Sequence, residues 1–172
     1  AGDRQHVGGR LEPGTAVALA QDIGGQLDAL DFVPEVLLLS FHGMPQRTLE
    51  LGDPYHCQCL KTARLLAAAL ARPDMRIRPT FQSRFGRAKW LEPATDAVLA
   101  EEAAKGIRRL AIAAPGFSAD CLETLEELAI RGREQFTAAG GEHFAALACL
   151  NDGAAGMDML EAIVRRELAG WV

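Results

Sequence analysis

The sequence lacks the features of a membrane-spanning, secreted or nucleic-acid-binding protein. Its apolar runs are shorter than the roughly 18 residues that span a bilayer, and no charged-then-apolar leader pattern follows Ala1. It has no polybasic run, and its net charge of −5 opposes binding to nucleic acid. We therefore expect a cytoplasmic protein without a nucleic-acid partner, and peripheral association with a membrane surface stays open.

Cysteine is sparse as well, with four residues and no C-x-x-C pair: Cys57, Cys59, Cys121 and Cys149. Since no secretion signal is present, reduced thiols are the expected state. Cys57 and Cys59 form one C-x-C, which on its own favours a structural role over metal binding. The sequence does not fix the role of these two thiols.

The composition of the chain is that of a globular domain. It has 172 residues, of which 49% are hydrophobic and 24% charged, enough to bury one core. Glycine and proline occur in the first fourteen residues, so segment 1–14 is expected to be poorly ordered. Residues 15–172 are then predicted to form a single α/β domain.

Helical and strand patterns alternate along the chain. The predicted helices cover residues 15–30, 57–70, 93–105, 121–138 and 152–168, and the predicted strands cover residues 36–41, 76–81, 110–114 and 144–149. The first strand is continuously apolar, which is typical of a parallel strand covered on both faces. Pro79 places the second strand at an edge. This order predicts a Rossmann-like α/β fold, a four-stranded parallel sheet flanked by helices.

Three loops leave the carboxyl ends of the predicted strands, beginning at His42, Gln82 and Pro115. In open parallel sheets, ligands bind at that edge. His42 directly follows its strand, and Glu123 lies in the first turn of the helix after the third loop. An imidazole and a carboxylate at one edge suit a divalent cation or proton exchange. The plainer alternatives are a strand-ending histidine and a solvated helix start.

Two more residues join these candidates by position. Glu127 is four residues after Glu123, so both share one helix face. Trp90 lies in the second loop, where it is either core packing or a flat apolar wall. Composition alone does not separate these two interpretations.

Six motifs together resemble one known family. They are S-F-H-G-M-P, G-D-P-Y, F-Q-S-R-F-G, W-L-E-P-x-T-D, P-G-F-x-A-D-C-L-E-T-L-E-E and C-L-N-D, spread over residues 40–152. In order and spacing they resemble ferrochelatase, over roughly residues 35–168. The resemblance is to the C-terminal half of the proteobacterial members.

The resemblance implies a metal-inserting lyase of haem and porphyrin biosynthesis. Fe²⁺ would enter a porphyrin, most simply protoporphyrin IX, as a substrate and without an organic cofactor. Some bacterial members carry a [2Fe-2S] cluster, but the four cysteines here make a poor set for one. His42 and Glu123 match the catalytic pair that faces the macrocycle, and Glu127 would join them in binding the metal.

Four further residues are implied to form the substrate pocket. Trp90 matches a pocket-wall tryptophan, Gln82 and Ser83 match a loop near the pocket, and Cys121 stands where other members have histidine. The helix that carries Glu123 is expected to contain a π-bulge, because such bulges cluster at functional sites.

The family chain is about twice as long as this one, with a pocket shared between two similar halves. The resemblance therefore implies that a missing N-terminal half, or a homodimer partner, completes the pocket. Arg131 also stands where some members have an acidic residue. A row of carboxylates along this helix would therefore end at Glu127. The isolated 172-residue chain is expected to be inactive. The alternatives are a half-sized homodimeric tetrapyrrole chelatase and a non-catalytic domain that binds a metal or a porphyrin.

Overall fold

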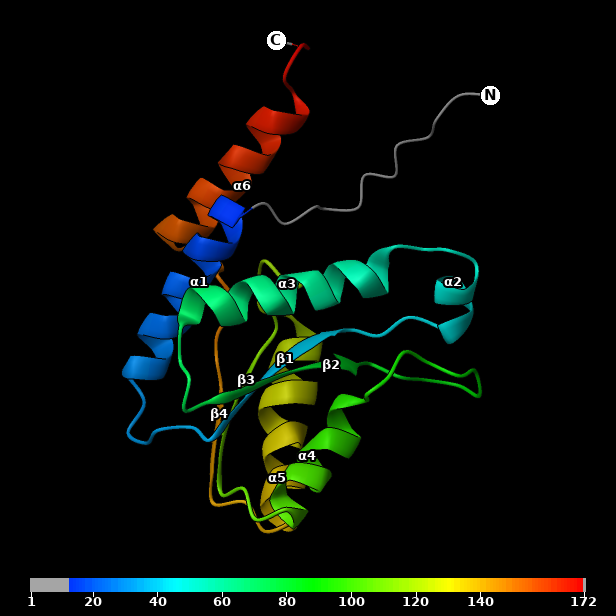
Figure 1. The fold of residues 1–172 in the computed structure, drawn as a ribbon, viewed down its shortest axis with the longest axis vertical. Helices are drawn as coiled ribbons and strands as arrows, with labels where there is room; N and C mark the ends of the chain where they lie inside the picture. Colours follow the sequence, from blue (N-terminus) through cyan, green and yellow to red (C-terminus); the bar gives the residue numbers. More distant parts are fainter. Residues whose placement is uncertain (1–12, 172) are drawn as a thin grey trace.

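A four-stranded parallel sheet forms the centre of the protein, as a computed structural model that describes residues 13–171 shows (Figure 1). The strand order is β2-β1-β3-β4, and every neighbouring pair is parallel. The strands are β1 (Val36–His42), β2 (Arg76–Gln82), β3 (Arg109–Ala113) and β4 (His143–Ala146). The predicted Rossmann-like α/β fold is therefore confirmed, and so is the edge position of the strand that contains Pro79.

Helices cover both faces of the sheet (Figure 1). One face carries α1 (Pro13–Asp28) and α3 (Tyr55–Leu70), and the other carries α4 (Thr95–Ala104), the π-helix η1 (Glu123–Arg131) and α5 (Gly132–Ala138). Successive side chains of β1 enter opposite cores, with Leu37 and Leu39 facing α1 and α3, and Val36 and Leu38 facing α4 and η1. A continuous apolar strand is what two covered faces require.

Several element boundaries differ from those that the sequence predicts. The loop after His42 contains a short helix, α2 (Gln46–Glu50). Pro93 does not open a helix, because α4 begins at Thr95 after a cis peptide bond between Glu92 and Pro93. The predicted helix 121–138 is divided into η1 and α5, which confirms the expected π-helical irregularity.

The two ends of the chain add a helix each. The C-terminal helix α6 (Ala154–Glu167) lies beside α1 (Figure 1). Of segment 1–14, the first twelve residues lie outside the described part, and α1 begins at Pro13. No helix within residues 13–171 is long and apolar enough to cross a membrane.

The strand order creates a topological switch point between β1 and β3. The chain passes from β1 to β2 on one side and then crosses to β3 on the other. The loops that leave β1 and β3 therefore diverge, and the crevice between them is where such sheets bind ligands. His42 ends β1 at this crevice, and the loop after β3 leads to Glu123 at the start of η1.

Gly43 allows close contact between the ends of β1 and β2. Its amide donates a hydrogen bond of 2.8 Å to the Gln82 carbonyl. A Cβ at this position would lie 2.5 Å from that same oxygen and 3.3 Å from the Trp90 ring. Only glycine therefore lets the His42 segment pack here without moving its neighbours.

We expect Gly43→Ala to lower the free energy of unfolding by about 1–3 kcal/mol, because the new methyl group clashes with backbone. The matched control is Gly25→Ala in α1, where an added Cβ meets nothing within 4 Å. That control should leave stability unchanged or raise it by about 0.5–1 kcal/mol. Urea unfolding measures both variants, and equal effects would contradict the close contact.

Candidate functional site

His42 is held by its main chain while its ring stays available. The Tyr55 hydroxyl donates to the His42 carbonyl at 2.9 Å, and the imidazole lies edge-on to the Phe117 ring, with 6.2 Å between centroids. Neither ring nitrogen hydrogen-bonds to another residue in the described part of the chain. The strand therefore presents a half-buried imidazole with free nitrogens, which can accept a proton or bind a metal.

Glu123 lies in the first turn of η1, and its surroundings favour the ionised form. The Cys121 thiol lowers the pKa of this carboxyl most, followed by the Glu123 main-chain amide, and His42 lowers it further through its charge. Glu123 is therefore a carboxylate at neutral pH.

Gln82 joins the strand that carries His42 to the helix that carries Glu123. Its side-chain Oε1 accepts from the Ser40 hydroxyl at 2.8 Å, and its Nε2 donates to the Glu123 carbonyl at 3.1 Å. Its own carbonyl accepts the Gly43 amide. The side chain is only 2% exposed, so its amide serves contacts within the protein.

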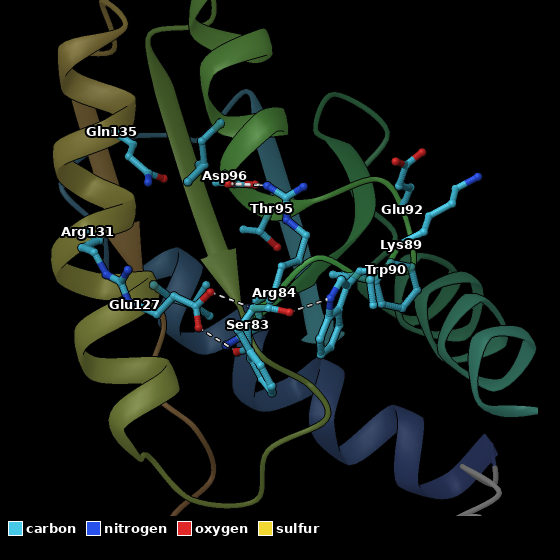
Figure 2. Close-up of a pocket in the computed structure, with 17 residues that line it drawn as sticks. Ser83, Arg84, Lys89, Trp90, Glu92, Thr95, Asp96, Glu127, Arg131 and Gln135 are labelled. Atoms are coloured by element: carbon cyan, nitrogen blue, oxygen red, sulfur yellow. Dashed lines mark hydrogen bonds and ion pairs between the residues drawn. The ribbon is translucent and has the colours of Figure 1, made fainter. Parts of the chain in front are cut away.

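Ser83 and Glu127 form a second contact between β2 and η1. The Ser83 amide and hydroxyl donate to the two oxygens of the Glu127 carboxylate, each at 2.7 Å (Figure 2). Ser83 has a φ of 63°, a left-handed conformation that is uncommon outside glycine. Glu127 thus accepts hydrogen bonds from the first residue of the segment after β2, which we call the pocket loop (residues 83–92).

A cavity of about 360 Å³ lies between the pocket loop, the start of α4 and η1 (Figure 2). Trp90 forms part of its wall, with the indole N–H donating to the Phe85 carbonyl at 3.0 Å and the two rings 4.9 Å apart. The tryptophan is therefore wall rather than core. Gln82, Ser83 and Glu127 also line this cavity, whereas His42 and Glu123 lie outside it.

Cys57 and Cys59 lie on α3, whereas Cys121 and Cys149 lie near each other around Asp120 and Thr124. Cys57 is exposed and Cys59 buried, and burial raises the pKa of the Cys59 thiol to about 11. Burial, together with Asp120, raises the pKa of Cys149 to about 12. Among the described residues, no group of three or more His, Cys, Asp or Glu side chains is placed to hold a metal ion.

Sequence reasoning missed the pair that fixes the start of η1. The Asp120 amide donates to Asn151 Oδ1, and Asn151 Nδ2 donates back to Asp120 Oδ2, both at 2.8 Å. Asp120 Oδ1 also accepts the Thr124 hydroxyl at 3.0 Å. The C-L-N-D motif was the available signal, because an asparagine beyond a strand is suited to the left-handed backbone that Asn151 adopts, with a φ of 50°.

A family model of ferrochelatase matches residues 11–168. The chain belongs to the ferrochelatase family. It is 55% identical over 155 residues to the ferrochelatase of Methylocella silvestris, which covers 90% of this chain and 44% of the relative. It is 53% identical over 155 residues to that of Rhizobium meliloti, covering 90% and 46%. The chain thus spans about half the length of the curated relatives it matches.

A solved structure, SirB from Bacillus subtilis with Fe³⁺, has the same fold. Its TM-score is 0.59 at 16% sequence identity, and the match covers 88% of this chain and 53% of that chain. At this identity the likeness concerns the fold alone. It agrees with the parallel sheet and flanking helices of Figure 1.

The low pKa of Glu123 gives a direct test of its environment. We expect Cys121→Ala to move the Glu123 titration midpoint upward, toward the ordinary value of 4.5, because the thiol contributes most to the lowering. The carboxyl ¹³C chemical shift, followed by NMR against pH, reports the midpoint. Cys57→Ala removes an exposed thiol on α3 and should leave it in place. An unmoved midpoint in Cys121→Ala would contradict this arrangement.

Proposed function

We propose that this chain forms one wall of a site that inserts Fe²⁺ into a porphyrin, with protoporphyrin IX as the expected substrate, in haem biosynthesis. The observation that carries the proposal is the placement of His42 and the ionised Glu123 at the switch point of the sheet. Membership of the ferrochelatase family supports the same reaction. We expect the reaction to take place in the cytoplasm, with any membrane contact peripheral.

Metal insertion needs both a proton acceptor and a metal ligand. As Fe²⁺ enters the macrocycle, two pyrrole N–H protons must leave, and the metal must shed water ligands. In our proposal the His42 imidazole accepts the two pyrrole protons one at a time and releases each to solvent, and the Glu123 carboxylate replaces water on the arriving metal. The two side chains would face the ring, so that metal delivery and proton removal occur at its centre.

The remaining candidates would shape the pocket. We assign Trp90 to a flat wall against the porphyrin and Cys121 to a contact beside Glu123, whose charge it stabilises. Glu127, on the same helix, would join the metal path when its carboxylate is free of Ser83. Gln82 and Ser83 would support the pocket through their contacts with η1.

The remaining part of the pocket would come from outside these 172 residues. The relatives are about twice as long, so we propose that a further half of the chain, or a second copy, supplies the facing wall. The 172 residues alone should therefore turn over slowly or not at all. A mass measurement in solution separates a half-sized homodimer from a monomeric longer chain.

We expect His42→Ala in the full-length protein to reduce porphyrin metallation at least about 100-fold, as loss of an acid–base group does, with unchanged folding by circular dichroism. Glu123→Gln should reduce it as well, because the neutral amide is a poor metal ligand. Loss of protoporphyrin IX fluorescence on metal insertion gives the rate.

The matched control is His143→Ala, which alters an exposed histidine at the amino end of β4, away from the switch point. It should retain the activity. Undiminished metallation by His42→Ala would refute its assigned role. If the unmodified full-length protein binds porphyrin tightly without turnover, the non-catalytic binding alternative is correct instead.

A further inference from the structure

The paired hydrogen bonds between Ser83 and Glu127 connect the segment after β2 to the π-helix η1. We propose that they are a latch that holds the pocket loop closed on the π-helix, with Glu127 as a positioning residue for the loop. In the observed state both carboxylate oxygens of Glu127 accept from Ser83, one from the amide and one from the hydroxyl. Bonds to an ionised acceptor are stronger than neutral ones, so this contact can hold a loop.

The backbone of Ser83 shows why the loop needs such a contact. Its φ of 63° lies in the left-handed region, which a serine occupies only when its surroundings impose it. The contact that imposes this conformation is the Glu127 carboxylate, since it binds the amide and hydroxyl of the same residue. Without it, Ser83 would relax to an extended conformation and the direction of the loop would change.

The other end of the pocket loop is fastened differently. The Gln46 amide donates to the Lys89 carbonyl at 2.8 Å, and the Leu91 amide donates to the Met44 carbonyl at 2.9 Å. These backbone bonds tie residues 89–91 to the segment that follows His42. The stretch between the two ends is exposed, and the side chain of Phe85 is 70% accessible. Opening the latch therefore leaves the first half of the loop held by the exposed ion pair between Arg84 and Asp96 of α4, while the second half stays attached by its backbone bonds.

The latch also affects the cavity wall. Trp90 contacts Phe85 through its ring and its indole N–H, and Phe85 is two residues beyond Ser83. Release of Ser83 would move Phe85 and remove the support of the tryptophan. This part of the inference rests on the proposed function, in which Trp90 meets the porphyrin. The latch itself does not depend on it.

Limited digestion with trypsin tests the latch without any activity assay. Three cleavage sites lie in the loop, after Arg84, Arg87 and Lys89. When opening is fast relative to cleavage, the digestion rate follows the population of the open loop. In the full-length protein we expect Glu127→Ala to raise cleavage at these sites at least about tenfold, since both bonds to Ser83 are lost. Ser83→Ala should give a smaller increase.

A double-mutant cycle makes the test specific, because coupled residues give non-additive effects. Ser83→Ala should speed cleavage in the unmodified background and add nothing in the Glu127→Ala background. Glu126→Ala removes the neighbouring carboxylate, which pairs with Arg131, and should leave cleavage unchanged. Glu127→Gln keeps the side-chain shape and should be intermediate, which covers the case in which Glu127→Ala fails to fold.

Two results would overturn the latch: equal cleavage of Glu127→Ala and Glu126→Ala, or an effect of Ser83→Ala that is the same in both backgrounds. Kinetics then test its part in the pocket, where Ser83→Ala should raise the porphyrin KM several-fold with little change in kcat. A fall in kcat at unchanged KM would contradict that part. If the unmodified protein inserts no metal, the proposed function fails, while the digestion result still decides the latch.

Discussion

The buried side-chain amide of Gln82 is the contact on which the candidate site depends. His42 ends β1 and Glu123 begins η1, so no stretch of regular structure holds them in register. Gln82 connects them, through its carbonyl to Gly43 and through its Nε2 to the Glu123 main chain. Because the side-chain amide is buried, losing its Ser40 or Glu123 partner leaves an unsatisfied group, at a cost of about 1–3 kcal/mol. The buried Gln82 side chain therefore fixes the position of His42 relative to Glu123.

The π-helix η1 receives support from side chains along its length. Asp120 and Asn151 fix the segment before it, Gln82 binds its first carbonyl, and Ser83 binds Glu127 one turn later. A π-helix is rare and usually confined to a single turn within an α-helix, frequently at a functional site. Here the external contacts come from the loops after β2, β3 and β4, which meet at one edge of the sheet. The edge that would bind the ligand thus also stabilises the irregular helix.

Much of this arrangement could be predicted from the sequence, because the underlying signals are local. The continuous apolar run in β1 predicted the parallel sheet, Pro79 predicted the edge strand, and His42 lies at the carboxyl end of β1 as expected. The hydrogen bonds of Gln82 and Ser83 could not be predicted, since they join residues far apart in sequence. Pro93 was misplaced because proline suits both a helix start and a turn, and the cis bond is invisible in a sequence.

We propose that His42 and Glu123 face a porphyrin at the switch point between β1 and β3. A crystal structure of the full-length protein with bound protoporphyrin IX tests this most directly. We expect the macrocycle at the carboxyl edge of the sheet, with the His42 imidazole and the Glu123 carboxylate directed at its pyrrole nitrogens and Trp90 against its plane. A porphyrin bound elsewhere, or one in contact with neither His42 nor Glu123, would contradict this proposal.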